Sequence, residues 1–347
     1  MSLFINTIKE SEIINSYNFA RNSDLVFSEI ISKDNYKKLD NKNHNIIFED
    51  KDKIFYKASF LKVKSGDTIF SNTYFVEPLL EKIRETSLED IKIITSQTDI
   101  PITNRLYSKK PKNIAKWFSI NVDIDRDDLI PIPYGLANSY SPKNLFKTHF
   151  ENLSNLNKQE NIYMNFEINT NYFHRYKSYK KLRNKKNFLV ERKKLGLDTY
   201  SRNLNLYKYI YCPWGNGFDT HRLWEALYSG AIAIVPRHKT FSTTKDLPVI
   251  QYDNLNELSF EYLSIKQKEL QYDYKKLSID YWMKDIKYKN QKTFKPNEIL
   301  IKFDDELDIK NYKKRLKAEK KSKNISTNLR KVHSSLFKLN LNKLNTY

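Results

Sequence analysis

Short runs of apolar residues alternate with segments of helical spacing along much of the chain. Strands are predicted for DTIFS from Asp67, IKIITS from Ile91, WFSINVDI from Trp117, LIPIPYGL from Leu129, NIYMNF from Asn161, YKYIYC from Tyr207, AIAIV from Ala231 and VIQY from Val249. Helices are predicted for FVEPLLEKIRET from Phe75, a basic stretch at 174–186, THRLWEALYSG from Thr220 and YDYKKLSIDYWMKDIK from Tyr272. Strands that alternate with helices are typical of parallel sheets, so the pattern predicts an α/β fold.

A polar stretch from Lys147, KTHFENLSNLNKQE, interrupts this alternation and indicates a linker between two domains. A chain of 347 residues exceeds what one core usually organises, which also favours two domains. We therefore expect an N-terminal α/β domain over residues 1–150 and a C-terminal one over 151–290. Residues 291–347 lose most of their apolar content, and we expect them to form a basic helical or flexible tail.

The net charge of +20 is concentrated in two places. Residues 175–196 carry ten Lys or Arg and one Glu, and residues 310–347 carry twelve and one, so the rest of the chain is neutral. Local basic clusters suit a phosphorylated ligand, an anionic lipid or a nucleic acid, although a solvated tail is the simpler interpretation of 310–347.

Other features of the composition concern the cellular location. No apolar run reaches the roughly 20 residues that cross a bilayer, and the N-terminus lacks the pattern of a signal peptide. The single cysteine, Cys212, suits a reducing compartment. We expect a cytoplasmic protein, with the basic tail as a candidate for peripheral membrane contact.

The stretch CPWGNGFDTHRLWEALYSGAIAIVP, residues 212–236, holds two of the six glycines within three positions. Gly215 and Gly217 follow a strand and precede a helix, for which Asp219 is the predicted N-cap and Gly230 the C-terminal stop. Glycine allows positive φ and lets a ligand approach the backbone. The loop is therefore predicted to deliver a helix N-terminus to the carboxyl end of a strand, where open α/β sheets bind anionic ligands.

Two charged residues share one face of this helix. Arg222 and Glu225 are three positions apart, so a phosphate could bind the first and a ribose the second. Such a pair is more often a solvent-exposed ion pair, and the stretch has neither a P-loop nor the glycine fingerprint of dinucleotide-binding folds. From these residues alone, nucleotide binding and a structural pair both remain open.

The same stretch resembles the nucleotide-sugar-binding segment of exostosin-like and fucosyltransferase-like glycosyltransferases. Further matching pieces occur in order along residues 52–287: SGDTIF, IITSQTDIPI, WFSINVD, IPIPYGLAN, NFEINTNYFHR and LSIDYWMKDI. The sequence departs from the family pattern at Trp214, which has no assigned role beyond stacking on a base or sugar, and at Ala233, which replaces an expected proline. The resemblance implies the GT-B architecture, in which two Rossmann-like domains with parallel sheets face each other across a cleft.

The resemblance also implies a function and a set of site residues. It implies a hexosyl- or pentosyltransferase with no cofactor or metal, which takes a nucleoside-diphosphate sugar as co-substrate and a glycan or glycolipid as acceptor on the N-terminal side. Arg175 and Arg222 would contact the diphosphate and Glu225 the ribose. The remaining residues expected to line the donor pocket are Asn216, Gly217, Asp219, Thr220 and His221.

Arginines and helix N-terminal amides would stabilise the charge that develops on the departing diphosphate without a metal. An inverting transfer also needs a base for the acceptor hydroxyl, and the candidate is Asp99, at the end of the predicted strand IKIITS. Asp99 is equally well placed to cap a turn before Pro101. Asp67 and Glu77 are weaker candidates for the same role.

Three other functions compete with this hypothesis. Asp123 and Asp125 form a D-x-D sequence, which binds manganese and the donor diphosphate in single-domain GT-A glycosyltransferases, although acidic loops of this kind are usually solvated. Interleaved Tyr and Lys in RYKSYKKLRNKK would suit a nucleic-acid-binding protein, a partner we do not expect here. A third alternative is a catalytically inactive relative that only binds glycans.

Overall fold

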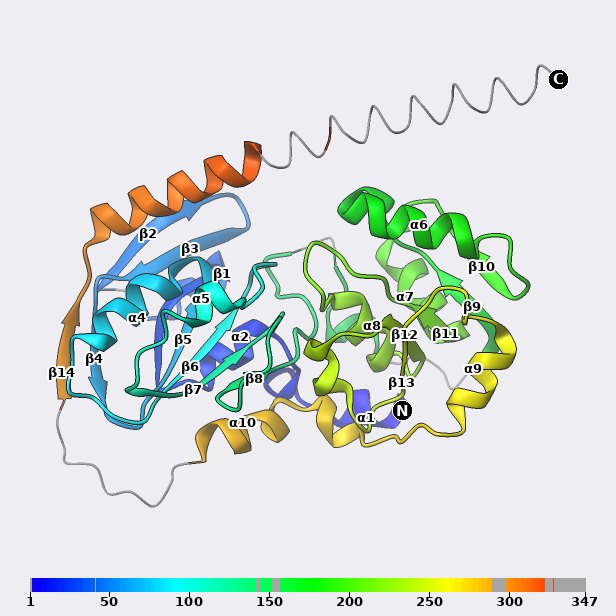
Figure 1. The fold of residues 1–347 in the computed structure, drawn as a ribbon, viewed down its shortest axis with the longest axis horizontal. Coiled ribbons are helices and arrows are strands. Elements are labelled where there is room, and N and C mark those ends of the chain that lie inside the picture. The colour runs from blue at the N-terminus through cyan, green and yellow to red at the C-terminus, as the bar shows by residue number, and fades with distance from the viewer. Residues whose placement is uncertain are drawn as a thin grey trace. The chain divides into compact units, whose positions relative to one another are not determined.

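The computed structural model describes residues 2–40, 42–141, 144–151, 157–288, 298–321 and 327. The chain divides into two compact units, Met1–Phe303 and Asp304–Tyr347. In the second unit, residues 305–321 are helical. The first unit contains two separate β-sheets and a two-stranded ribbon (Figure 1).

The first sheet has seven strands in the order β2-β3-β1-β5-β6-β7-β8. Its strands are β1 (Leu25–Ser32), β2 (His44–Glu49), β3 (Lys53–Ala58), β5 (Thr68–Asn72), β6 (Ile91–Ser96), β7 (Ile114–Ser119) and β8 (Leu129–Pro131). The five strands from β1 to β8 are parallel to one another, whereas β3 is antiparallel to both β1 and β2. The sheet is therefore mixed and largely parallel.

Several helical segments precede, connect or follow these strands. They are α1 (Ser2–Thr7), η1 (Glu10–Glu12), α2 (Ser16–Arg21), α3 (Lys33–Tyr36), η2 (Thr73–Phe75), α4 (Val76–Arg84), α5 (Asn104–Tyr107) and η3 (Lys147–His149). Helix α4 buries Val76, Leu79, Leu80 and Ile83, a spacing that gives it one apolar face. This confirms the helix predicted from Phe75.

The second sheet has five strands, all parallel, in the order β10-β9-β11-β12-β13. They are β9 (Gln159–Met164), β10 (Phe188–Val190), β11 (Tyr207–Tyr211), β12 (Ile232–Pro236) and β13 (Val249–Tyr252). The helical segments between and after them are η4 (Ile168–Asn171), α6 (Tyr172–Leu182), α7 (Leu197–Leu206), α8 (His221–Tyr228), η5 (Lys239–Thr244), α9 (Phe260–Gln267) and η6 (Tyr274–Leu277). Every β12 residue is buried, which explains why its sequence reads as one apolar run.

Alternate residues of the second sheet enter two different cores. Ile210 and Ala233 pack with Leu204 of α7 and Leu227 of α8, whereas neighbouring strand residues pack with α6 and α9 on the other face. Both faces of the sheet are thus covered, as expected for a doubly wound α/β domain. The two sheets are compatible with two Rossmann-like domains.

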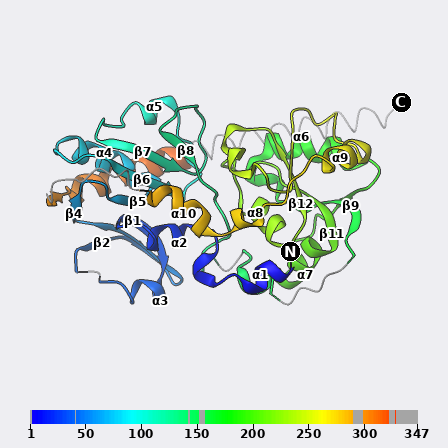
Figure 2. The ribbon, with the colours of Figure 1, turned by 90° about the horizontal axis from the view of Figure 1, so that it is seen from below.

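The loops that follow the first-sheet strands β7 and β8 contact the loop that follows β11 in the second sheet. The backbone N–H of Asp219 donates to Oδ1 of Asn121, and the N–H of Tyr134 donates to Oδ2 of Asp219, both at 2.9 Å. In open sheets, ligands bind at the carboxyl ends of parallel strands. These contacts therefore bring together the edges of the two sheets at which a ligand could bind. Figure 2 shows the two sheets and the segments between them from below.

The chain returns to the first sheet after β13. Helix α10 (Ile279–Lys287) packs against α2, and β14 (Glu298–Lys302) pairs antiparallel with β4 (Phe60–Lys64). The aromatic ring of Phe303 then packs on Phe27 with centroids 4.2 Å apart. Residues 298–303 therefore belong to the larger unit, so the tail begins later than the expected boundary at 291. Most of the expected tail lies outside the described residues.

Candidate functional site

The strand order of the second sheet reverses between β9 and β11. From β9 the chain moves to β10 on one side, then returns to β11 and continues outward through β12 and β13. Ligands of open α/β sheets bind at such a switch point, outside the carboxyl ends of the strands. The segments there are 165–175, which leads into α6, and 212–222, which leads into α8.

The loop 212–220 is held by backbone contacts. The N–H of Gly215 donates to the carbonyl of Gly217 at 3.0 Å, and the side-chain amide of Asn171 donates to the carbonyl of Gly215 at 2.8 Å. Positive φ occurs at Gly66, Gly135 and Gly230 and not at Gly215 or Gly217, so the loop does not use the positive φ that glycine allows.

What Gly217 provides is room for another part of the chain. A Cβ at this position would lie 2.6 Å from Nδ2 of Asn121, in the loop after β7. Real Cβ atoms do not approach a neighbour so closely. The close approach that the glycine permits is therefore made by Asn121 of the first sheet. The exposed Asn216 beside it has no hydrogen bond with a described residue.

Arg175 is buried and crosses between the two loops of the switch point. Its guanidinium donates to the carbonyls of Trp214 at 2.7 Å, Glu167 at 2.8 Å and Pro213 at 3.5 Å. Burial lowers its pKa to about 10, and the positive charge of Arg222 adds to this effect. Arg175 thus has a structural role, and the two arginines lie close enough to repel each other.

Arg222 and Glu225 project from α8 toward α7. The guanidinium of Arg222 lies 5.2 Å from the ring centroid of Tyr200, whose hydroxyl donates to Oε2 of Glu225 at 2.9 Å. Glu225 is 4% exposed, so it is not part of a solvent-facing ion pair. Nη1 of Arg222 is buried and has no hydrogen-bond partner in the described part of the chain. A buried cationic donor without a partner is costly, and an anionic ligand would satisfy it.

Asp219, Thr220 and His221 lie where the two sheets meet. Thr220 is the N-cap residue of α8, so the prediction of Asp219 as N-cap is wrong. Both carboxylate oxygens of Asp219 accept from Nε1 of Trp224 at 3.0 Å, in addition to the bond from Tyr134. Burial raises the pKa of Asp219 to about 7. Asp219 thus connects the segments that follow the two sheets. No local sequence pattern indicates this role, because Tyr134 is 85 positions away.

The ring of His221 stacks on Tyr134 with centroids 4.1 Å apart, and its Nδ1 lies 2.8 Å from the carbonyl of Gly135. Burial lowers the pKa of His221, and the negative charge of Asp99 is among the opposing effects. Asp99 therefore lies within electrostatic reach of the N-terminus of α8. Its side chain is exposed and has no hydrogen bond with a described residue, so no capping bond before Pro101 is seen.

Sequence reasoning missed an aromatic cluster beside the arginines. His174 stacks on Trp214 with centroids 4.8 Å apart, and Phe218 stacks on His238 at 3.7 Å. Burial lowers the pKa of His174 to about 4, so its ring is neutral near pH 7. Nε2 of His174 and Nε1 of Trp214 are buried without partners among the described residues. The only sequence signal was Trp214 itself, which departs from the family pattern.

Two residues at the carboxyl ends of the first sheet were also missed. Gln97 after β6 has a φ of 69° and Asn121 after β7 has a φ of 53°. Both values lie in the left-handed region, which residues other than glycine rarely adopt. Asp90, Asn187 and Asp246 adopt the same region, so it is their place at the carboxyl ends of the strands that makes Gln97 and Asn121 candidates. Neither residue type distinguishes these positions in the sequence.

Both carboxylates of the D-x-D sequence already have partners, a histidine whose pKa burial lowers and a lysine. Asp123 lies 3.2 Å from Nε2 of His238, and Asp125 lies 2.6 Å from Nζ of Lys239. Both partners lie at the start of η5, between β12 and β13 of the second sheet. The two aspartates thus connect the loop after β7 of the first sheet to η5. Within the described residues, no group of three His, Cys, Asp or Glu could hold a metal ion.

Comparisons with known proteins leave the family open. No family model matches the chain, and no curated protein sequence is significantly similar to it. Among the described residues, no helix combines the length and apolar character that a membrane span requires.

Proposed function

We propose that the chain is a metal-independent glycosyltransferase that transfers a sugar from a nucleoside-diphosphate sugar to a hydroxyl acceptor. The observation that carries the proposal is the pair Arg175 and Arg222, at the point where the strand order of a parallel sheet reverses. Arg222 offers a buried donor without a partner among the described residues, and its charge adds to the burial that lowers the pKa of Arg175. A diphosphate would relieve both costs at once.

The proposed donor lies across the carboxyl ends of β9 and β11. The diphosphate contacts Arg222 and the N-terminal amides of α8, which favour negative charge. Oε1 of Glu225 accepts from the ribose, since Oε2 already accepts from Tyr200. His174 and Trp214 supply unpartnered ring nitrogens near the same loops.

In the proposed GT-B arrangement, the base for the acceptor hydroxyl is Asp99, whose negative charge acts on His221 at the start of α8. In an inverting transfer, the acceptor hydroxyl oxygen bonds to the anomeric carbon while the bond from that carbon to the diphosphate breaks. The hydroxyl proton passes to the carboxylate of Asp99, and the nucleoside diphosphate leaves with the electron pair. Arg222 stabilises the charge that grows on the leaving group.

Calorimetric titration with nucleoside diphosphates and with the matching free nucleosides tests the donor site. Arg222→Gln should weaken diphosphate binding by roughly 10- to 100-fold, because charge-assisted hydrogen bonds are lost, and should leave nucleoside binding unchanged. Arg237→Gln is the matched control, since Arg237 pairs with Asp253 in an exposed salt bridge. If no nucleotide binds, or if both variants behave as wild type, the proposal is wrong.

A further inference from the structure

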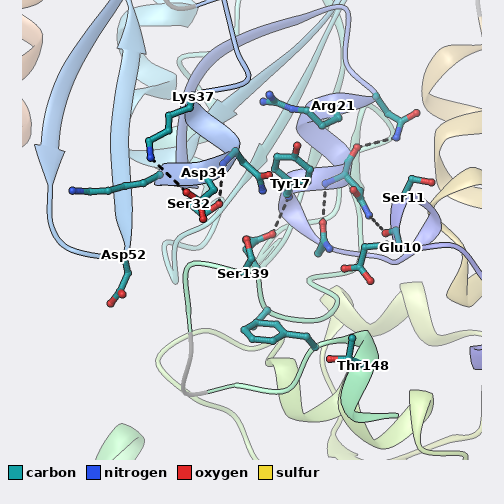
Figure 3. Close-up of a pocket in the computed structure, with 18 of the residues that line it drawn as sticks. Glu10, Ser11, Tyr17, Arg21, Ser32, Asp34, Lys37, Asp52, Ser139 and Thr148 are labelled. Atoms are coloured by element: carbon teal, nitrogen blue, oxygen red, sulfur yellow. Dashed lines mark hydrogen bonds and ion pairs between the residues drawn. The ribbon is translucent and has the colours of Figure 1, made fainter. Parts of the chain in front are cut away.

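A second cavity lies away from the switch point, on the side of the first sheet that carries α2 and α3. Its volume is about 1090 Å³. Figure 3 shows its labelled side chains, which come from η1, α2, the surroundings of α3, the loops near Asp52 and Ser139, and η3, which contains Thr148. Pockets for small molecules usually measure ~300–1000 Å³, so this cleft suits an extended ligand. We refer to it as the α2–α3 cleft.

Polar side chains that have no partner line the α2–α3 cleft. The side chains that form no hydrogen bond or ion pair with any described residue are those of Glu10, Ser11, Tyr17, Asn35, Lys51, Asp52, Ser139 and Thr148. These groups can donate to and accept from a ligand without breaking contacts within the protein. A ligand rich in hydroxyl groups would use both capacities.

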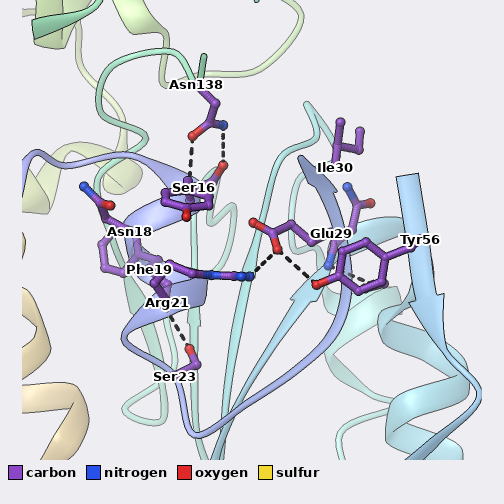
Figure 4. A network of polar contacts seen from close by, with 12 residues as sticks. Ser16, Asn18, Phe19, Arg21, Ser23, Glu29, Ile30, Tyr56 and Asn138 are labelled. Atoms are coloured by element: carbon purple, nitrogen blue, oxygen red, sulfur yellow. Dashed lines mark hydrogen bonds and ion pairs between the residues drawn. The ribbon is translucent and has the colours of Figure 1, made fainter. Parts of the chain in front are cut away.

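The charges of the cleft are largely cancelled by neighbours. Arg21 pairs with the fully buried Glu29, which also accepts from the hydroxyl of Tyr56 at 3.2 Å (Figure 4). Lys33 pairs with Glu49 at 2.6 Å. Lys37 lies 3.7 Å from Asp34.

Lys51 is the cation that lines the cleft without an ion pair to a described residue, and Glu10 and Asp52 are the carboxylates of the lining without one. The excess charge of the chain lies elsewhere, in residues 175–196 and 310–347. An acidic ligand would therefore find little net attraction in the cleft.

Few of the lining residues are apolar or aromatic. It consists of Ala137 and the rings of Tyr17 and Phe146. Peptides are usually recognised through pockets that take apolar side chains or through a free sheet edge, and the lining provides no such pocket. Partly exposed aromatic rings combined with amide and hydroxyl groups suit the alternating apolar and polar faces of sugar rings.

A smaller cavity links this cleft to the proposed site. Its volume is about 230 Å³, and it shares Ala137 and Asn138 with the α2–α3 cleft. Its lining also includes Gln97 and His221. The amide of Asn138, which lines both cavities, donates to Oγ of Ser16 at 2.6 Å, so its side chain is fixed where the two spaces meet. The end of a ligand in the cleft would thus approach the N-terminus of α8.

We propose that the α2–α3 cleft binds an uncharged oligosaccharide, which serves as the acceptor. As an assignment of the acceptor, this inference rests on the proposed function, whereas the binding of the oligosaccharide can be measured without a donor. The site selects by hydroxyl hydrogen bonds and by ring stacking. It does not select for sulfate or carboxylate groups.

The test is a calorimetric titration of the full chain with a panel of uncharged and acidic tetrasaccharides. The uncharged members are gluco-, manno- and chitotetraose, and the acidic ones are tetragalacturonate and a heparin tetrasaccharide. At least one uncharged member should bind with an affinity that changes less than about twofold between roughly 0.05 and 0.5 M salt, since no net charge is screened. Tyr17→Ala should weaken the binding of this tetrasaccharide by about tenfold.

Matched insertions locate the binding in the cleft. Ser139→Trp should abolish oligosaccharide binding because the exposed serine lines the cleft, whereas Ser87→Trp, at an exposed serine outside it, should not. The inference is overturned if no uncharged tetrasaccharide binds, if acidic members bind better with salt-sensitive affinity, or if Ser139→Trp binds as wild type. A parallel nucleotide titration separates the two proposals. Nucleotide binding without oligosaccharide binding would support only the donor site, and oligosaccharide binding without nucleotide binding would support only the cleft.

Discussion

The hydroxyl of Tyr200 donates to Oε2 of Glu225 at 2.9 Å, and both side chains are buried. Glu225→Ala should therefore lower the free energy of unfolding by about 1–3 kcal/mol, because the hydroxyl loses its acceptor and Arg222 loses a nearby negative charge. The same change should weaken nucleoside diphosphate binding by roughly 10- to 150-fold if the ribose uses Oε1. Chemical denaturation and calorimetry measure the two effects separately.

Two further variants distinguish stability from binding at this pair. Glu225→Gln keeps an acceptor for Tyr200, so it should retain most of the stability and have an intermediate nucleotide affinity. Tyr200→Phe should cost about 1 kcal/mol of stability and leave nucleotide affinity close to wild type. Glu225 is purely structural if its alanine variant is destabilised but binds nucleotides normally.

The role of Asp219 should be visible in the dependence of stability on pH. Burial raises its pKa to about 7, well above its ordinary value near 4. The folded state thus holds this proton more tightly than the unfolded state, so the contribution is fully present below about pH 4. It is lost as the pH rises toward 7, by up to ~1.4 kcal/mol per pH unit.

Asp219→Asn should flatten this part of the profile, which denaturation at several pH values measures. Glu29, whose pKa burial also raises to about 7, contributes with the same sign in both proteins. His174 acts in the opposite direction, because its pKa is lowered to about 4 and the unfolded state binds its proton first. The difference between variant and wild type isolates Asp219. Identical slopes for the two proteins would contradict the assignment.

The periodicity of apolar residues predicted the helices and strands whose pattern is regular within the element itself. Helix α8 has one strongly apolar face and β12 is a continuous apolar run, so both were predicted close to their observed bounds. The antiparallel strands β2 and β3 and the neighbouring β1 were not predicted. The apolar run of β1 is interrupted by the fully buried Glu29, whose partners Arg21 and Tyr56 lie on α2 and β3. A buried charge is tolerated only through such distant partners, which no local pattern reveals.

The candidate site divides in the same way. The loop, the helix start and the cations near the switch point followed from residue types and order. The functions of Asp219 and Gly217 depend on Tyr134 and Asn121, which are remote in sequence and become neighbours only through the meeting of two sheets. Arg175 was predicted as a phosphate ligand, and most of its donors are instead directed to the carbonyls of neighbouring loops.

Gly217→Ala should destabilise the protein by about 1–3 kcal/mol, because the added Cβ would lie 2.6 Å from Nδ2 of Asn121. Thermal or chemical denaturation measures the loss. Gly196→Ala is the matched control, since a Cβ added at Gly196 would meet no atom within 4 Å and the φ of this residue is −65°. The control should be neutral or slightly stabilising. Equal effects of both changes would show that Asn121 moves aside without cost.

Truncation tests the boundary between the two compact units. A chain that ends at Phe303 should keep its cooperative unfolding, because it retains β14 and the contact between Phe303 and Phe27. A chain that ends at residue 297 should be less stable, since β4 loses its partner strand. Circular dichroism melts of both chains measure the difference. Insolubility of the longer one would place residues 304–347 within the folded core.

Sugar transfer, if the proposed function is correct, should survive removal of divalent cations. Asp125 pairs with the cation Lys239, and Asp123 lies 3.2 Å from Nε2 of His238, whose pKa burial lowers, so Mn²⁺ would have to replace an existing partner of each carboxylate. Activity measured in EDTA should therefore match activity with added Mn²⁺, and Asp125→Asn should change the rate by less than about threefold, since Asp125 is exposed and its salt bridge contributes little. Asp123→Asn keeps an oxygen acceptor for His238 and should behave similarly. Complete loss of activity in EDTA, restored by Mn²⁺ in wild type but not in Asp125→Asn, would instead assign the donor diphosphate to a metal at the D-x-D sequence.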